Sequence, residues 1–229
     1  MSRPRAAILI SGRGSNMVAL LKAAANDPAY PAEFALVLSN RPDAGGLGRA
    51  AAFGVPTATV ESRAFRGDRA GFEAAMGTVL AEHRVDLIAL AGFMRVLTEG
   101  FVRHWSGRLV NIHPSLLPAF PGLDTHARAL AAGVRLHGCT VHLVSPGVDE
   151  GPILAQAAVP VLAGDTAESL AARVLAEEHR LYPAALAWLA AGRVRLEGGR
   201  AVVAGAQAAV DAALRNPLPD GPAMHTPEA

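Results

Sequence analysis

The chain has 229 residues, of which 51% are hydrophobic and 18% charged, so it can bury a sizeable core and is not disordered as a whole. Its 21 basic and 20 acidic residues leave a net charge of +1, which argues against nucleic acid as a partner because such surfaces need a basic excess. The longest apolar run, Leu87 to Met94, is much shorter than the ~20 residues of a membrane-spanning helix. The apolar start, Ala6 to Ile10, is too short for a signal peptide. With its single cysteine, the composition predicts a cytoplasmic protein without a membrane partner.

The first half of the chain alternates between strand-like and helix-like segments. Apolar runs bounded by turn residues predict strands at Ala6–Ser11, Phe34–Ser39, Pro56–Val60, Asp86–Ala91 and Arg108–His113. Helical spacing separates them at Met17–Ala24, Gly46–Phe53 and Phe72–Leu80. Such alternation is typical of a parallel sheet with helices on both faces. We therefore expect an α/β protein with a Rossmann-like, mostly parallel twisted sheet.

The second half departs from simple alternation. Pro114–Gly122 contains three prolines and is expected to be a loop. The elements predicted after it are a helix at Thr125–Ala132, strands at Cys139–Val144 and Ile153–Val161, a long helix at Ala167–Ala191 with Pro183 as a kink or boundary, and a hairpin at Val194–Val203. We expect one continuous domain over residues 1–205, followed over 206–229 by a C-terminal helix fragment and a flexible tail.

The turn Gly12-Arg13-Gly14-Ser15-Asn16 joins the first strand to the first helix. Backbone N–H groups and the positive end of the helix dipole make such a junction suited to a phosphate, and Ser15 or Asn16 is expected to cap the helix. The dinucleotide fingerprint is incomplete, because Met17 replaces its third glycine and no acidic residue closes the second strand. A phosphate site and a plain capped turn both remain open.

Asn111 and His113 stand at the carboxyl end of the fifth predicted strand, where open parallel sheets bind ligands. The two side chains point to one side of that strand, and an amide beside an imidazole can hold a developing oxyanion. The later acidic turn contains Asp149, whose carboxylate would favour the imidazolium and relay a proton if it lay near His113. A hydrogen-bonded structural histidine and an ordinary acidic turn are the alternatives.

The segment His137 to His142 also contains Cys139, which raises the question of a metal site. On a strand His137 and Cys139 face one way and His142 the other, and no second ligand pair of zinc-like spacing is present. We therefore predict no metal, a packed Cys139 rather than a nucleophile, and a supporting role for His142.

Two sets of arginines could meet acidic ligands. Arg95 follows the fourth strand, at the sheet edge that carries His113. Arg63, Arg66 and Arg69 form a separate basic cluster, which is either a solvated face or a contact for a carboxylate-bearing tail.

These pieces, in this order, resemble the phosphoribosylglycinamide formyltransferase family from about Ala6 to Arg200. The resemblance is carried by the segments ILISGRGSNM, LVLSNRPDAGGL, LIALAGFMRVL, RLVNIHPSLLPAFPGLDTHARAL, HGCTVHLV, VDEGPILAQ and EEHRLYP. The Asn-x-His-Pro segment and the later Asp-x-Gly-Pro are shared by a wider formyltransferase group, whereas the early Gly-Ser-Asn turn is more specific.

The resemblance implies a role for each matching residue. The catalytic residues would be Asn111, His113 and Asp149. The ribonucleotide site would comprise Gly14, Ser15, Asn16 and Glu178. The folate site would comprise Arg69, Arg95, Val96, Leu97 and Val144. The resemblance further implies an N-terminal half that binds the nucleotide phosphate and a C-terminal half that binds the folate.

The implied reaction transfers the formyl group of 10-formyltetrahydrofolate to the amine of glycinamide ribonucleotide, in a monomer or homodimer without metal. A formyltetrahydrofolate deformylase and a formyltransferase acting on aminoacyl-tRNA use the same residues and are the nearest alternatives. The early phosphate turn, the neutral net charge and the expected absence of an N-terminal regulatory domain disfavour them. An alternative of a different class is a non-catalytic nucleotide-binding module.

Overall fold

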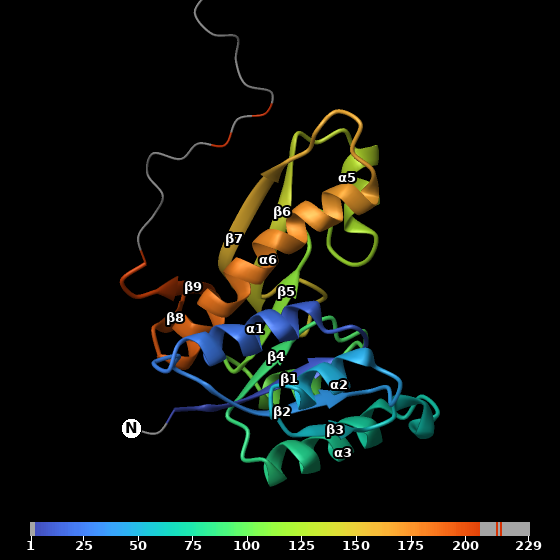
Figure 1. Ribbon diagram of the computed structural model, residues 1–229, viewed down its shortest axis with the longest axis vertical. Coiled ribbons are helices and arrows are strands. Elements are labelled where there is room, and N and C mark those ends of the chain that lie inside the picture. The colour runs from blue at the N-terminus through green and yellow to red at the C-terminus, as the bar shows by residue number, and fades with distance from the viewer. Residues whose placement is uncertain (1–2, 207–213, 215, 217–229) are drawn as a thin grey trace, which may run out of the picture.

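The computed structural model describes residues 3–206, 214 and 216. The helix fragment and tail expected over 206–229 therefore lie outside the described residues, apart from residues 206, 214 and 216. Seven strands form one sheet in the order β3-β2-β1-β4-β5-β6-β7 (Figure 1). Their bounds are β1 Arg5–Ile10, β2 Glu33–Ser39, β3 Thr57–Thr59, β4 Leu87–Leu90, β5 Leu109–His113, β6 Leu136–Leu143 and β7 Ile153–Pro160.

The sheet is parallel from β3 to β5, and the last two strands, β6 and β7, are each antiparallel to the strand before them. This mostly parallel arrangement confirms the predicted fold class. A separate two-stranded sheet of β8 (Val194–Glu197) and β9 (Arg200–Val203) confirms the predicted hairpin.

Helices cover both faces of the sheet. One apolar cluster joins the sheet to α1 (Ser15–Asn26), α2 (Gly45–Ala51), α5 (Thr125–Ala131) and α6 (Ala167–Ala190). A second cluster lies on the opposite face, against α3 (Arg69–Glu82) and α4 (Glu99–His104), after the short 3-10 helix Ser62–Phe65. Along β1, Ile8 and Ile10 join the first cluster, whereas Ala7 and Leu9 join the second. Burial on both faces explains why β1 is apolar at every position from Ala6 to Ile10 rather than alternating.

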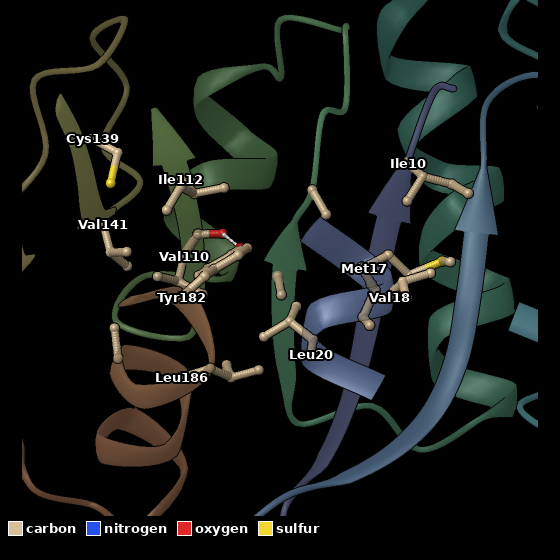
Figure 2. Close-up of a cluster of buried hydrophobic side chains, with 14 of the residues drawn as sticks. Ile10, Met17, Val18, Leu20, Val110, Ile112, Cys139, Val141, Tyr182 and Leu186 are labelled. Atoms are coloured by element: carbon tan, nitrogen blue, oxygen red, sulfur yellow. Dashed lines mark hydrogen bonds between the residues drawn. The ribbon is translucent and has the colours of Figure 1, made fainter. Parts of the chain in front are cut away.

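Tyr182 of α6 ties this helix to the middle of the sheet. The side chain is fully buried, and its hydroxyl donates to the carbonyl oxygens of Leu90 at 2.9 Å and Val110 at 3.2 Å. Figure 2 shows Tyr182 beneath Val110 and Ile112, with Val141 and Cys139 on the strand to their left. The contact fixes the end of β4 and the first part of β5 relative to α6. The polar residues of β5 begin directly after Val110, at Asn111.

Several local expectations need correction. Neither Ser15 nor Asn16 caps α1, because Gly14 is the N-cap residue, in the left-handed conformation at φ 66°, and Ser15 is already helical. Pro183 does not end α6, which continues to Ala190 after a capping box at Thr166. Helix α4, capped by Thr98, was not expected from the sequence, and β6 begins three residues before Cys139, at Leu136.

Within the described part of the chain, no helix combines the length and the hydropathy that crossing a bilayer requires.

Candidate active site

Four polar side chains lie on one face of β5 and β6. In the antiparallel register Asn111 is opposite His142, and His113 is opposite Thr140. Directly opposed residues share a face, so these four side chains point away from α6, whose apolar contacts occupy the other face. The sheet thus brings together residues that the sequence places about thirty positions apart.

The imidazole of His113 has a partner at each ring nitrogen. Nδ1 lies 3.3 Å from Oδ2 of Asp149, and Nε2 lies 3.0 Å from the carbonyl oxygen of Phe120. Only 7% of the His113 side chain and 12% of the Asp149 side chain are exposed. Two acceptors suit the protonated ring, in which both nitrogens donate. The structure therefore places Asp149 beside His113, the juxtaposition on which the catalytic hypothesis depends.

Asp149 reaches this position from a turn that folds back over the sheet. The turn leaves β6 at Leu143 and returns so that the Leu143 N–H donates to the carbonyl oxygen of Pro152 at 2.9 Å. A Cβ on Gly151 would overlap the Leu143 carbonyl oxygen, so only glycine permits this close approach. Asp149 itself has φ 56°, a left-handed conformation that Asp tolerates better than most residues.

The surroundings of Asp149 favour its ionised form. Burial alone would raise its pKa, but the nearby His142 ring, a hydrogen bond from the Gly122 N–H, and positive charge at His113 and His142 bring the pKa below its usual value. The Gly122 N–H donates to Oδ2 at 2.8 Å. A carboxylate is therefore present at neutral pH to hold an imidazolium.

His142 connects the remaining member of the group. Its Nε2 lies 3.3 Å from Nδ2 of Asn111 and 3.7 Å from Oδ1 of Asp149. The ring thus lies between the amide and the carboxylate, which agrees with the supporting position expected for it.

The glycine turn after β1 lines a cavity of about 450 Å³ at the carboxyl ends of β1, β2 and β4. The carbonyl oxygens of Gly12 and Arg13 accept from Gly46 N–H and from Arg49, both on α2, at 3.0 and 3.1 Å. Helix α2 thus holds the turn in place at the start of α1, whose first N–H groups have no partner within the helix. The other lining residues are Ser11, Gly14, Ser15, Asn16, Asn40, Arg41, Ser62, Arg63, Ala91, Gly92, Met94 and Arg95.

Glu178 of α6 is joined to this turn. Asn16 Nδ2 donates to its carboxylate at 2.6 Å, and both side chains are buried. Burial raises the pKa of Glu178, while the Asn16 bond opposes the rise. The predicted ribonucleotide residues Gly14, Ser15, Asn16 and Glu178 are therefore neighbours in space.

The predicted folate residues are less closely grouped. Arg95 lines the cavity, Val96 is 63% exposed beside it, and Leu97 and Val144 pack against the second apolar cluster. Arg69, the first residue of α3, does not line that cavity, whereas Arg63 of the same basic cluster does.

Cys139 is fully buried on the α6 side of the sheet. Burial, with negative charge at Glu178 and Glu177, raises the pKa of its thiol to about 12, so a nucleophilic thiolate is not available at neutral pH. His137 lies instead against the ring of His126, at 5.3 Å between centroids. No cluster of three or more His, Cys, Asp or Glu suited to a metal occurs among the residues that the structure describes.

Two backbone groups of the site had no signal in the sequence. The Phe120 carbonyl and the Gly122 N–H both come from the proline-rich loop, and each contacts an ionisable side chain of the site. Backbone groups carry no residue-specific pattern, so only the folded loop identifies them.

Comparison with known proteins agrees with this geometry. The formyl transferase family matches residues 4–186, and the chain belongs to that family. It is 43% identical to phosphoribosylglycinamide formyltransferase of Escherichia coli over 189 residues, which cover 82% of this chain and 88% of that protein. It is also 46% identical to the trifunctional purine biosynthetic protein adenosine-3 of Bos taurus, but spans only 20% of that protein's length. The structure of glycinamide ribonucleotide transformylase 1 from Symbiobacterium toebii is similar, with a TM-score of 0.84 at 47% identity, over 88% of this chain and 94% of that one.

Proposed function

We propose that the chain transfers the formyl group of 10-formyltetrahydrofolate to the primary amine of glycinamide ribonucleotide, a step of de novo purine synthesis. The observation that carries the proposal is the convergence of Asn111, His113 and Asp149 at the same edge of the sheet as a glycine turn suited to a phosphate, at the carboxyl ends of the parallel strands. The bacterial relatives that match over nearly their whole length carry this activity in their names.

The ribonucleotide phosphate binds at the start of α1. The turn from Gly12 to Asn16 offers backbone N–H groups and the helix dipole, with the Ser15 hydroxyl as a further donor. Glu178, held by Asn16, lies where it can meet the glycinamide part of the same substrate.

The folate binds on the adjoining side of the cleft. Leu97 and Val144 offer apolar surface to its ring, and the exposed Arg95 offers a cation to its carboxylates. The formylated nitrogen is thereby directed toward Asn111 and His113.

The chemistry needs no covalent intermediate with the protein. The neutral amine attacks the formyl carbon, forming a C–N bond and a tetrahedral oxyanion. Asn111 and His113 donate hydrogen bonds to this oxyanion. The bond from carbon to the folate nitrogen then breaks, and the proton lost by the amine reaches that nitrogen through Asp149 and His113.

Donation by His113 requires one exchange of partners. Nδ1 stays with the Asp149 carboxylate, because a charged acceptor binds more strongly than a neutral one. Nε2 exchanges the Phe120 carbonyl for the formyl oxygen, so the loop that carries Phe120 must yield slightly when the folate enters. Asn111 needs no such exchange, because its amide has a second N–H.

Three substitutions test the assignment. Asn111→Ala, His113→Ala and Asp149→Asn should each lower kcat by about 10²–10³, the usual cost of one oxyanion donor or proton-transfer group. Asparagine tolerates the left-handed backbone of position 149, so Asp149→Asn removes the charge without disturbing the turn. Near-normal kcat in all three variants, measured on folded protein, would overturn the proposal.

The phosphate assignment has its own readout. Ser15→Ala combined with Asn16→Ala should raise the KM for the ribonucleotide about tenfold or more, since hydrogen bonds to charged groups are each worth about 1.5–3 kcal/mol. An unchanged KM would argue against a phosphate at this turn.

Incubation with formylfolate separates the alternatives. Loss of the formyl group only when glycinamide ribonucleotide is present as the acceptor supports the proposal. Release of formate in its absence, with water as the acceptor, indicates a deformylase. Binding of NAD without binding of folate would indicate a nucleotide-binding module. We expect activity in the cytoplasm by a monomer or homodimer, and sedimentation equilibrium distinguishes the two assemblies.

A further inference from the structure

Thr140 occupies the middle of a row of three side chains on the site face of the sheet. Its neighbour on β5 is His113, and its neighbour on β7 is Gln156. Thr140 is fully buried, whereas Gln156 lies on the exposed edge strand. Neither residue contacts the cavity beside the glycine turn, and neither has a role in the chemistry described above.

The Thr140 hydroxyl makes every hydrogen bond that a hydroxyl can make. It donates to the carbonyl oxygen of Ser115 at 2.6 Å. It accepts from the Leu117 N–H at 3.0 Å and from Nε2 of Gln156 at 3.0 Å. One donor and two acceptor positions are all that a hydroxyl offers, so the group is saturated.

Gln156 binds the same loop directly. Its Nε2 also donates to the carbonyl oxygen of Leu117 at 2.8 Å. Together Thr140 and Gln156 thus bind both backbone groups of Leu117 and the carbonyl of Ser115. The first part of the loop, residues 115–117, is tied to β6 and β7 by side chains rather than by strand pairing.

The other part of the loop carries the backbone groups of the catalytic centre. Ser115 continues the chain of bonds, because its hydroxyl donates to the Ala119 carbonyl oxygen at 2.7 Å. The next residue, Phe120, places its carbonyl at His113, and Gly122 places its N–H at Asp149. Residues 120 and 122 of the loop therefore contact His113 and Asp149, while Thr140 holds the start of the same loop at residues 115 and 117.

We propose that Thr140 and Gln156 are positioning residues for formyl transfer. They clamp residues 115–117, so that only residues 118–122 move when His113 exchanges the Phe120 carbonyl for substrate. This inference rests on the proposed function. In this inference the clamp orients His113 and Asp149. It does not contribute to binding of the ribonucleotide, because the glycine turn lies elsewhere, between β1 and α1.

The central test compares Thr140→Val with Thr140→Ser. Valine has the same shape but no hydroxyl, and it leaves the Ser115 carbonyl and the Leu117 N–H without partners. We expect kcat to fall at least tenfold and the KM for the ribonucleotide to stay within about twofold. Hydrogen exchange at the Leu117 amide should become at least tenfold faster. Serine keeps the hydroxyl and should restore both kcat and slow exchange.

Two further variants keep the test decisive. Ile8→Val removes a buried methylene on β1 and controls for a general loss of stability, with kcat expected unchanged. Gln156→Leu removes only the outer bonds and should lower kcat by a smaller factor than Thr140→Val, and it carries the test if the valine variant does not fold.

The outcomes separate this inference from the proposed function. Slow exchange at Leu117 in Thr140→Val would overturn the clamp, and an unchanged kcat would overturn its positioning role whatever the exchange rate. A serine variant no better than valine would overturn both. If the parent chain transfers no formyl group to glycinamide ribonucleotide, the proposed function is overturned, even when amide exchange at Leu117 is fast in Thr140→Val. In that case the hydroxyl would hold the loop without positioning a transferase site.

Discussion

His137 predicts a loss of stability in mild acid. The ring is 1% exposed, and neither ring nitrogen has a hydrogen-bond partner. Burial, with positive charge at His126 and a smaller contribution from His113, lowers the pKa of His137 to about 4. The nearby Pro114 backbone opposes this shift only in part. The ring is therefore neutral in the folded chain at a pH where an exposed histidine is protonated.

The sign and size follow from proton linkage. Between pH 6.5 and about 4 the unfolded chain binds a proton that the folded chain does not, so the free energy of unfolding falls as the pH falls through this window. At 1.36 kcal/mol for each pKa unit, the full interval is worth about 3 kcal/mol. For a chain of this length that corresponds to roughly 6–12 °C in Tm.

The assay is urea unfolding at several pH values between 7 and 4, on the parent chain and on His137→Phe. Phenylalanine keeps a ring against Phe120 and His126 but cannot bind a proton. The variant should show a shallower loss of stability toward pH 4, by about 3 kcal/mol over the window. His104→Gln, at an exposed position on α4, serves as the control and should follow the parent. Parallel pH profiles for the parent and His137→Phe would refute the reasoning.

Three further substitutions test separate contacts. Gly151→Ala should displace the turn that carries Asp149 and lower kcat at least about tenfold, or about 1.4 kcal/mol in activation free energy, as steady-state kinetics would show. Tyr182→Phe should cost about 1 kcal/mol in unfolding free energy, because the hydroxyl that donates to the Leu90 and Val110 carbonyl oxygens is lost, and an unchanged denaturation midpoint would contradict this. Arg95→Ala should raise the KM for formylfolate by roughly fivefold at most, the scale of an exposed ion pair, while an unchanged KM would remove Arg95 from the folate site.

The strands of the first half and their parallel arrangement were accessible from the sequence, because local patterns indicate both; their order in the sheet was not predicted. Apolar runs such as Ala6–Ser11 and Asp86–Ala91 end at glycine turns and alternate with helical spacing, and this combination favours a parallel sheet. Helix α4 was not accessible, because its six residues include one glycine and two basic residues and show no apolar period. The cap of α1 was also wrong, since a left-handed Gly14 begins the helix where a side-chain cap was expected.

The candidate site was accessible in its residues but not in its geometry. Asn111 and His113 share a side of one strand by simple alternation. The approach of Asp149 depends on a turn that folds back over the sheet, and the pairing of His113 with Thr140 depends on strand register. Both are long-range features that no local pattern encodes, so the clamp on the loop emerged only from the structure.

Because β5 and β6 pair in a fixed antiparallel register, the number of residues in β6 determines which of its side chains face the candidate site. Suppose that a single residue between Leu136 and Cys139 is deleted and the start of β6 keeps its pairing. Every later residue of the strand then shifts by one position and faces the opposite side of the sheet. The thiol of Cys139 and the aliphatic Val141 would then face the candidate site, and the polar side chains of Thr140 and His142 would be forced against α6. A change in the length of the loops around this strand does not shift its register in this way, but an odd change of length within the strand would abolish the candidate site without replacing any of its residues.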